Sequence, residues 1–69
     1  MGEPGNVPMR FRLARVLRTQ NRFADALAQA QAVLQLESSH VGAHWTAAEC
    51  LESMGRATEA LGAYREALQ

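Results

Sequence analysis

The chain has 69 residues, of which 48% are apolar and 20% charged, and its formal net charge is zero. A chain of this length forms one domain at most and buries only about 60% of the surface that it exposes when unfolded, so it can hardly supply the walls of a catalytic cleft, and we expect no enzyme activity. Its single cysteine excludes an internal disulfide, and no apolar run reaches the roughly 18 residues of a membrane-spanning helix.

The first seven residues, with Gly2, Pro4 and Gly5 among them, are expected to form a disordered lead or a remnant of cloning. They lack the basic start and apolar core of a signal peptide, and Asn6 stands where myristoylation would need Ser or Thr. With the lone cysteine, these features point to a reducing, cytoplasm-like compartment and to no membrane association.

Charge is divided unevenly between the two halves of the chain. Residues 1–36 hold five arginines and two acidic residues, whereas residues 37–69 hold two arginines and five acidic residues, so the halves carry +3 and −3. Such a division can serve a partner or let the halves attract each other. All basic residues are arginine, which hints at a GC-rich bacterial genome.

The first expected helix begins at Pro8, which suits the first turn of a helix, and runs to about Gln20. Asn21 can take the left-handed conformation that ends a helix, and the second helix is expected over residues 23–36. The apolar residues at helical spacing in these two helices, expected to face the core, are Met9, Leu13, Val16 and Leu17, and Phe23, Ala26, Leu27, Ala30, Val33 and Leu34.

A polar break at residues 37–40, with Ser39 as the expected N-cap, precedes a third helix over residues 42–54. Gly55 is a stop signal, and Thr58 can cap a fourth helix that continues to Gln69. The residues of these two helices expected to face inward are Ala43, Ala47, Cys50, Leu51 and Met54, and Ala60, Leu61, Tyr64, Ala67 and Leu68. Because the connections are short and no strand-like alternation occurs, the sequence predicts an all-α fold of four antiparallel helices.

The sequence overlays itself without gaps when it is shifted by about 34 residues. The identical pairs, most of them at expected core positions, are Val7/Val41, Ala14/Ala48, Leu17/Leu51, Arg22/Arg56, Ala26/Ala60, Leu27/Leu61, Leu34/Leu68 and Gln35/Gln69. We therefore expect two tandem helix–turn–helix repeats, over residues 8–40 and 41–69, with the second truncated at its end.

This repeat length resembles that of the tetratricopeptide repeat family. The positions of the second copy that match the family pattern are Ala47, Ala48, Leu51, Gly55, Ala60, Leu61, Tyr64, Ala67 and Leu68. The first copy departs from it, with Asn21 for the turn glycine and Ala30 for the aromatic residue, and Ser38 replaces the usual proline between repeats. The resemblance covers about residues 7–69 and implies a fragment of an α-solenoid.

Two aromatic residues point away from the expected core. On a helical wheel Phe11 lies among arginines, and Trp45 lies beside Glu49 and Glu52. In the family that the chain resembles, the first helices of successive repeats line a concave groove that binds extended peptides or helices. By that resemblance the groove residues are Phe11, Arg12, Arg15, Arg18, Trp45, Thr46, Glu49 and Glu52. Alternatively, the aromatic residues pack against each other or a neighbouring repeat, and the arginines are solvated or pair with the two glutamates.

Other chemistry is weakly supported by the sequence. Cys50 lies on an apolar stripe and is expected to be a buried, inert thiol. His40, His44 and Cys50 do not make a metal site, because His44 and Cys50 fall on different helix faces and a fourth ligand is missing. The Lys and Asn residues of the family's carboxylate clamp are absent from the matching places, and we expect no cofactor.

On these grounds we expect a protein–protein interaction or scaffold module that binds a peptide or helix, as part of a longer repeat array or an oligomer. One alternative is nucleic-acid binding through the arginine-rich first helix, with Phe11 and Trp45 stacking on bases, although the acidic second half argues against it. Another is a purely structural segment. Self-association is expected because the outer side of the fourth helix has no following helix, whereas the third helix can cover Ala24, Ala28 and Ala32 on the second.

Overall fold

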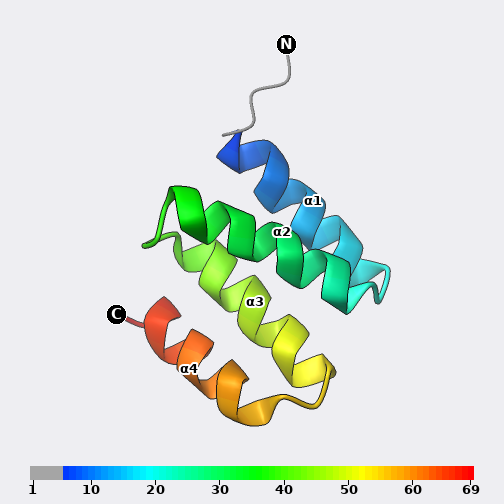
Figure 1. Ribbon diagram of the computed structural model, residues 1–69, viewed down its shortest axis with the longest axis vertical. Helices are drawn as coiled ribbons and strands as arrows, with labels where there is room; N and C mark the ends of the chain where they lie inside the picture. The colour runs from blue at the N-terminus through cyan, green and yellow to red at the C-terminus, as the bar shows by residue number, and fades with distance from the viewer. Residues whose placement is uncertain (1–5) are drawn as a thin grey trace.

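A computed structural model describes residues 6–69 of the chain, so that the expected lead lies mostly outside the described residues. The described part is all-α and contains no strand, as the sequence predicts. Its helices, which follow one another in chain order, are α1 (Val7–Thr19), α2 (Phe23–Leu36), α3 (Val41–Ser53) and α4 (Ala57–Ala67) (Figure 1). None of these described helices is both long and apolar enough to span a membrane.

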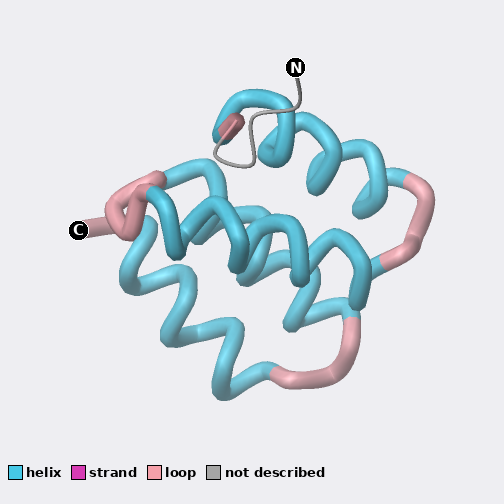
Figure 2. The backbone as a smooth tube through the Cα atoms, turned by 45° about the horizontal axis from the view of Figure 1, so that its top comes forward, coloured by secondary structure: helices cyan, strands magenta, loops and turns pink. Residues whose placement is uncertain are grey.

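Neighbouring helices run antiparallel, because the connections lie at alternating ends of the stack (Figure 2). α2 packs between α1 and α3, and α1 also contacts α3, so that the first helices of the two repeats meet. α4 packs against α3 alone among the described helices. The helices therefore stack in series rather than closing into a bundle.

The start of α1 is fixed by a side-chain cap. The Oδ1 of Asn6 accepts a hydrogen bond from the backbone N–H of Met9 at 3.0 Å, and Pro8 occupies the first turn. Val7, assigned to the lead on sequence grounds, is instead the first residue of the helix and is buried.

The two repeats turn in the same way after their first helices. Asn21 and Gly55 take positive φ angles of 64° and 78°, as their residue types predict. The next N–H in each turn reaches back to the helix: that of Arg22 donates to the carbonyl of Leu17 at 2.9 Å, and that of Arg56 to the carbonyl of Leu51 at 2.8 Å. Both turns are therefore Schellman motifs, which satisfy the last helix carbonyls.

The expected caps of α3 and α4 are wrong. His40 rather than Ser39 caps α3, because its Nδ1 accepts the backbone N–H of Ala43 at 3.0 Å. Thr58 lies inside α4, and the N-cap residue is Arg56, whose guanidinium binds both carboxylate oxygens of Glu59 at 2.7 and 2.8 Å. No described side chain accepts a hydrogen bond from the first backbone N–H groups of α4, and the charged pair only spans its first turn.

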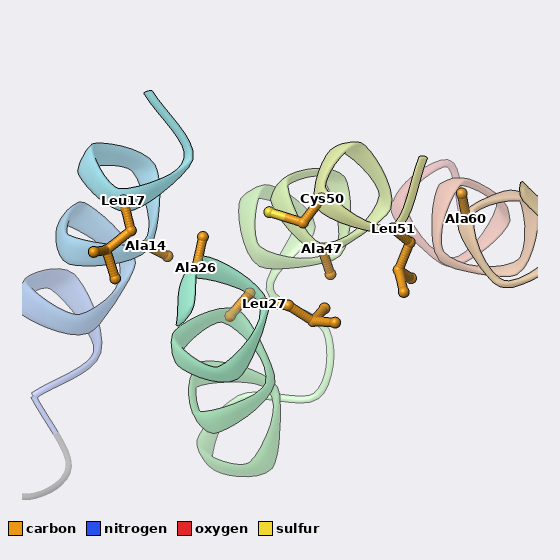
Figure 3. Packing of buried hydrophobic residues seen from close by; sticks show 9 residues of the cluster. Ala14, Leu17, Ala26, Leu27, Ala47, Cys50, Leu51 and Ala60 are labelled. Atoms are coloured by element: carbon orange, nitrogen blue, oxygen red, sulfur yellow. The ribbon is translucent and has the colours of Figure 1, made fainter. Parts of the chain in front are cut away.

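Small side chains dominate the main core, and they let the helices approach closely. Figure 3 shows residues of this cluster pointing into the space that neighbouring helices share. The buried members are Ala14, Leu17, Ala26, Leu27, Ala30, Ala47, Cys50, Leu51 and Ala60, with Phe23, Ala63 and Tyr64 packed against them. A second cluster contains Val7, Val33 and Ala43, with Phe11 and Leu34 at its edge.

Several residues expected to face inward are exposed. On α1 the neighbouring helices cover Val7, Ala14 and the expected Leu17, whereas the other residues of the expected stripe face solvent. The exposed large residues of the expected stripes are Met9, Leu13, Val16, Met54, Leu61 and Leu68. The expected cover over the small-residue face of α2 is also wrong. Ala24 and Ala28 are exposed, because α3 packs over Ala26, Leu27 and Ala30 instead.

Candidate functional site

A hollow of about 380 Å³ lies between α1 and α3, the first helices of the two repeats. We call this hollow the groove, and its lining residues are Phe11, Arg15, Arg18, Val41, Gly42, Trp45, Thr46 and Glu49. Six of the eight residues expected there thus line it, whereas Arg12 and Glu52 do not. Val41 and Gly42 were missed because neither carries a polar or aromatic group that would mark it in a sequence.

Phe11 is seated against the start of α3. Its ring lies 4.8 Å from that of His40 between centroids, and a Cβ added to Gly42 would come within 2.6 Å of the ring's Cζ. The guanidinium carbon of Arg15 lies 5.8 Å from the Phe11 centroid, within the range of a cation–π interaction. Gly42 therefore makes room for an aromatic ring that carries a cation on its groove side.

Trp45 rests on α4 rather than on Phe11. Its ring meets that of Tyr64 edge to face at a centroid distance of 4.8 Å and an interplanar angle of 73°. The Tyr64 hydroxyl in turn donates a hydrogen bond to the Oε1 of Glu52 at 2.9 Å. Trp45 remains 45% exposed, so it presents a large, well-supported apolar surface at the groove.

The surroundings of Tyr64 raise the pKa of its hydroxyl. Partial burial raises the pKa of the Tyr64 hydroxyl, and the hydrogen bond to Glu52 and the negative charges of Glu52 and Glu49 raise it further. The protonated hydroxyl is thus held as the donor. Glu52 is thus bonded to α4, and it lines a hollow beside that helix rather than the groove.

The charges of the groove do not cancel. The Nε of Arg18 lies 3.4 Å from the Oε1 of Glu49, an ion pair that is too long for a good hydrogen bond and leaves this buried nitrogen without one. Arg12 and Arg15 make no ion pair with any residue that the structure describes. With Glu49 paired to Arg18, the uncompensated charge beside the groove is positive.

Cys50 is fully buried on the core side of α3. Burial raises the pKa of its thiol, the nearby charge of Arg18 opposes this, and that of Glu49 adds to it. The group is a packed thiol and not an activated nucleophile. Within residues 6–69, no three His, Cys, Asp or Glu side chains gather as metal ligands would, and the His44 ring instead bonds the carbonyl of Ser38 at 2.8 Å.

Comparisons with known proteins agree with the helical-repeat fold. A family model described as the tetratricopeptide repeat matches residues 11–69. The chain is similar to the probable UDP-N-acetylglucosamine–peptide N-acetylglucosaminyltransferase SPINDLY of Arabidopsis thaliana, with 38% identity over 56 residues. That match covers 81% of this chain but 6% of the plant protein, so the chain spans only a small part of this relative's length. No solved structure matches the chain.

Proposed function

The chain belongs to the tetratricopeptide repeat family, whose members generally mediate protein–protein interactions, and from that premise we propose that its groove receives an extended or helical peptide. The observation that carries this proposal is Trp45, which is half exposed at the groove and held from behind by Tyr64. Rigid aromatic side chains of this kind are frequent anchors of binding energy in interfaces.

The charges and apolar surface beside the groove define the ligand's chemistry. Arg15 carries a charge that no ion pair with a described residue neutralises, while Phe11 and Trp45 offer apolar rings. A peptide with an acidic side chain close to a large apolar one would satisfy both. The internal ion pair between Arg18 and Glu49 leaves little negative charge to attract a basic ligand.

The test is selection from a display library of random twelve-residue peptides, followed by titration of the selected peptides, labelled with a fluorophore, by fluorescence anisotropy. The fluorophore is placed on the peptide because Trp45 is the single tryptophan of the chain and is itself one of the residues to be replaced. We expect selected peptides to combine Asp or Glu with Leu, Phe or Trp, and both Trp45→Ala and Arg15→Ala to weaken binding at least about tenfold. Arg65→Ala, at an exposed arginine of α4, is the matched control and should bind as the native chain does.

Enrichment of basic peptides, or equal binding by the Arg15→Ala and Arg65→Ala chains, would contradict the proposed ligand. Nucleic-acid binding is a separate outcome of the same titration. If oligothymidylate binds more tightly than the peptides, with an affinity that falls steeply as salt is added, the arginines serve phosphates instead.

Self-association, or docking to further repeats, is a second proposed property. It is favoured by large apolar side chains that face solvent at both ends of the stack, Leu13 and Val16 on α1 and Leu61 on α4. We propose no catalytic role, because the match to the plant transferase covers 6% of that protein.

A further inference from the structure

A second hollow, of about 190 Å³, lies over α3 and α4 on the far side of the stack from α1. We call it the tail face, and its lining residues are Glu52, Ala57, Ala60, Leu61 and Tyr64. The corresponding positions of the first repeat, 34 residues earlier, belong to α1 and α2 and are Arg18, Phe23, Ala26, Leu27 and Ala30. Within the chain α3 covers that first set: Leu27 is 7% exposed, whereas its counterpart Leu61 is 51% exposed.

α1 carries the complementary surface at the other end of the stack. We call it the head face, and it consists of Met9, Leu13 and Val16, which are 59%, 44% and 46% exposed. The repeat relates them to Ala43, Ala47 and Cys50, the residues of α3 that pack over α1 and α2 and are 0%, 4% and 0% exposed. The small residues that α3 buries against the first repeat thus correspond to larger apolar residues on α1. No described residue covers these larger residues.

The charges beside these faces indicate what covers them. Within the chain, Arg18 of the covered surface pairs with Glu49 of the covering helix. In the other repeat, Glu52 occupies the position of Arg18 and Arg15 occupies the position of Glu49, so the charges at both positions are opposite. If α1 of another copy lay over the tail face as α3 lies over α1 and α2, its Arg15 would meet Glu52. Neither residue has an ion pair with a described residue.

We propose that copies of the chain associate head to tail, with the head face of one copy seated on the tail face of the next. This inference rests on the self-association proposed above and specifies its surface. Because Met9, Leu13 and Val16 are larger than the α3 residues at the corresponding positions, the two helices lie further apart in this contact than in the internal one. Because the two faces differ, the interface is heterologous and adds copies in a row rather than closing a two-fold dimer.

Two blocked variants test this geometry by sedimentation equilibrium and light scattering. Leu13→Glu blocks the head face and Leu61→Glu blocks the tail face, since each buries an unpaired carboxylate in the contact. We expect the native chain to form a concentration-dependent series of oligomers. Each variant alone should be monomeric, and an equimolar mixture should form a heterodimer and nothing larger, because one chain keeps its tail face and the other its head face.

Leu36→Glu is the matched control, because Leu36 is an exposed leucine of α2 that lies in neither face. It should associate as the native chain does, and circular dichroism should show native helicity in every variant. If Leu13→Glu loses helicity, Arg15→Glu, at an exposed position, blocks the head face instead. A native chain that stays monomeric would overturn self-association altogether and leave both faces to other helices. Oligomers that survive Leu61→Glu, or variants that do not combine, would overturn only the head-to-tail arrangement.

Discussion

At the scale of single residues, a substitution at Gly42 should affect peptide binding more than the stability of the fold. A Cβ at this position would lie 2.6 Å from the Cζ of Phe11, so Gly42→Ala must displace the ring from its place against His40. The gain in helix propensity, about 0.5–1 kcal/mol, offsets much of the cost of that shift. We expect peptide binding at the groove to fall while the thermal midpoint changes little, as measured by fluorescence titration and a melt.

The matched substitution is Gly62→Ala in α4, where an added Cβ would meet no atom within 4 Å. Here the propensity gain of about 0.5–1 kcal/mol is unopposed, which corresponds to a rise of several degrees in the melting temperature of a small domain. Binding at the groove should be unchanged. Equal effects of the two substitutions on binding would show that Phe11 does not depend on Gly42.

Tyr64 makes stability depend on alkaline pH. Its pKa is raised in the folded chain above the ordinary value of 10.0, mainly by burial and then by Glu52. A raised pKa in the folded state means that its contribution is complete below the ordinary value and is lost as the pH rises through the folded value. Burial likewise raises the pKa of the Cys50 thiol above its ordinary value of 9.0. The free energy of unfolding should therefore fall above about pH 9–10, and Tyr64→Phe should make that fall shallower in denaturant titrations.

At the scale of helices and turns, the repeat and its punctuation could be predicted from the sequence. Asn21 and Gly55 mark the two left-handed turns by residue type alone, and the self-overlay gives four helices in the observed order. Which face of a helix is covered depends on its neighbours. Ala14 is buried and Leu13 half exposed on α1, because α2 and α3 both lie on the alanine side, a fact that hydrophobicity cannot supply.

The groove shows the same division between what a sequence carries and what it does not. Phe11, Arg15, Arg18 and Trp45 line it as the wheel and the family resemblance together predict, whereas Arg12 does not line it. Pairing of the arginines with the two glutamates is one of the alternatives that the sequence offers, but the sequence cannot select the partners, which are Arg18 with Glu49 and Tyr64 with Glu52. Such contacts depend on side-chain length and direction across two helices.

The turn after α3 should be sensitive to substitution at Gly55. Gly55 has a φ of 78°, which costs a residue with a Cβ about 1–2 kcal/mol. Gly55→Ala should lower the free energy of unfolding by about that amount. Gly55→Asn copies Asn21, which takes the same conformation in the first repeat, and should cost clearly less in the same urea titration. Equal losses would mean that the Schellman turn is not what ends α3.

Packing between α3 and α4 can be tested in the same way. Ala60 is 3% exposed within the main core, so Ala60→Leu should overpack the second hairpin and cost about 1–3 kcal/mol. Ala28→Leu adds the same atoms on an exposed face of α2 and should change stability by less than about 0.5 kcal/mol. An Ala60→Leu chain as stable as the Ala28→Leu chain would contradict the close approach of these helices.

At the scale of the whole molecule, the last helix of the stack has fewer neighbours than the other described helices, so stability depends on what covers that end. α3 is packed on by every other described helix, whereas α4 packs against α3 alone, so the last hairpin has the smallest share of the core. In repeat proteins each unit is stabilised mainly by its neighbours, and a stack this short has few of them. A contact that covers the tail face would therefore stabilise α4 as well as join the chains.

The melting temperature should consequently rise with protein concentration, since association that requires the folded chain shifts the folding equilibrium by mass action. The native chain melted over a hundredfold range of concentration should show this rise, and far-ultraviolet circular dichroism should show the added stability as retained helix. Leu61→Glu should melt at the same temperature across that range, because its tail face is blocked while its head face has no partner. A native chain whose midpoint is equally independent of concentration would show that α4 is stabilised within the monomer, by the ring pair of Trp45 and Tyr64 and the alanines beneath it.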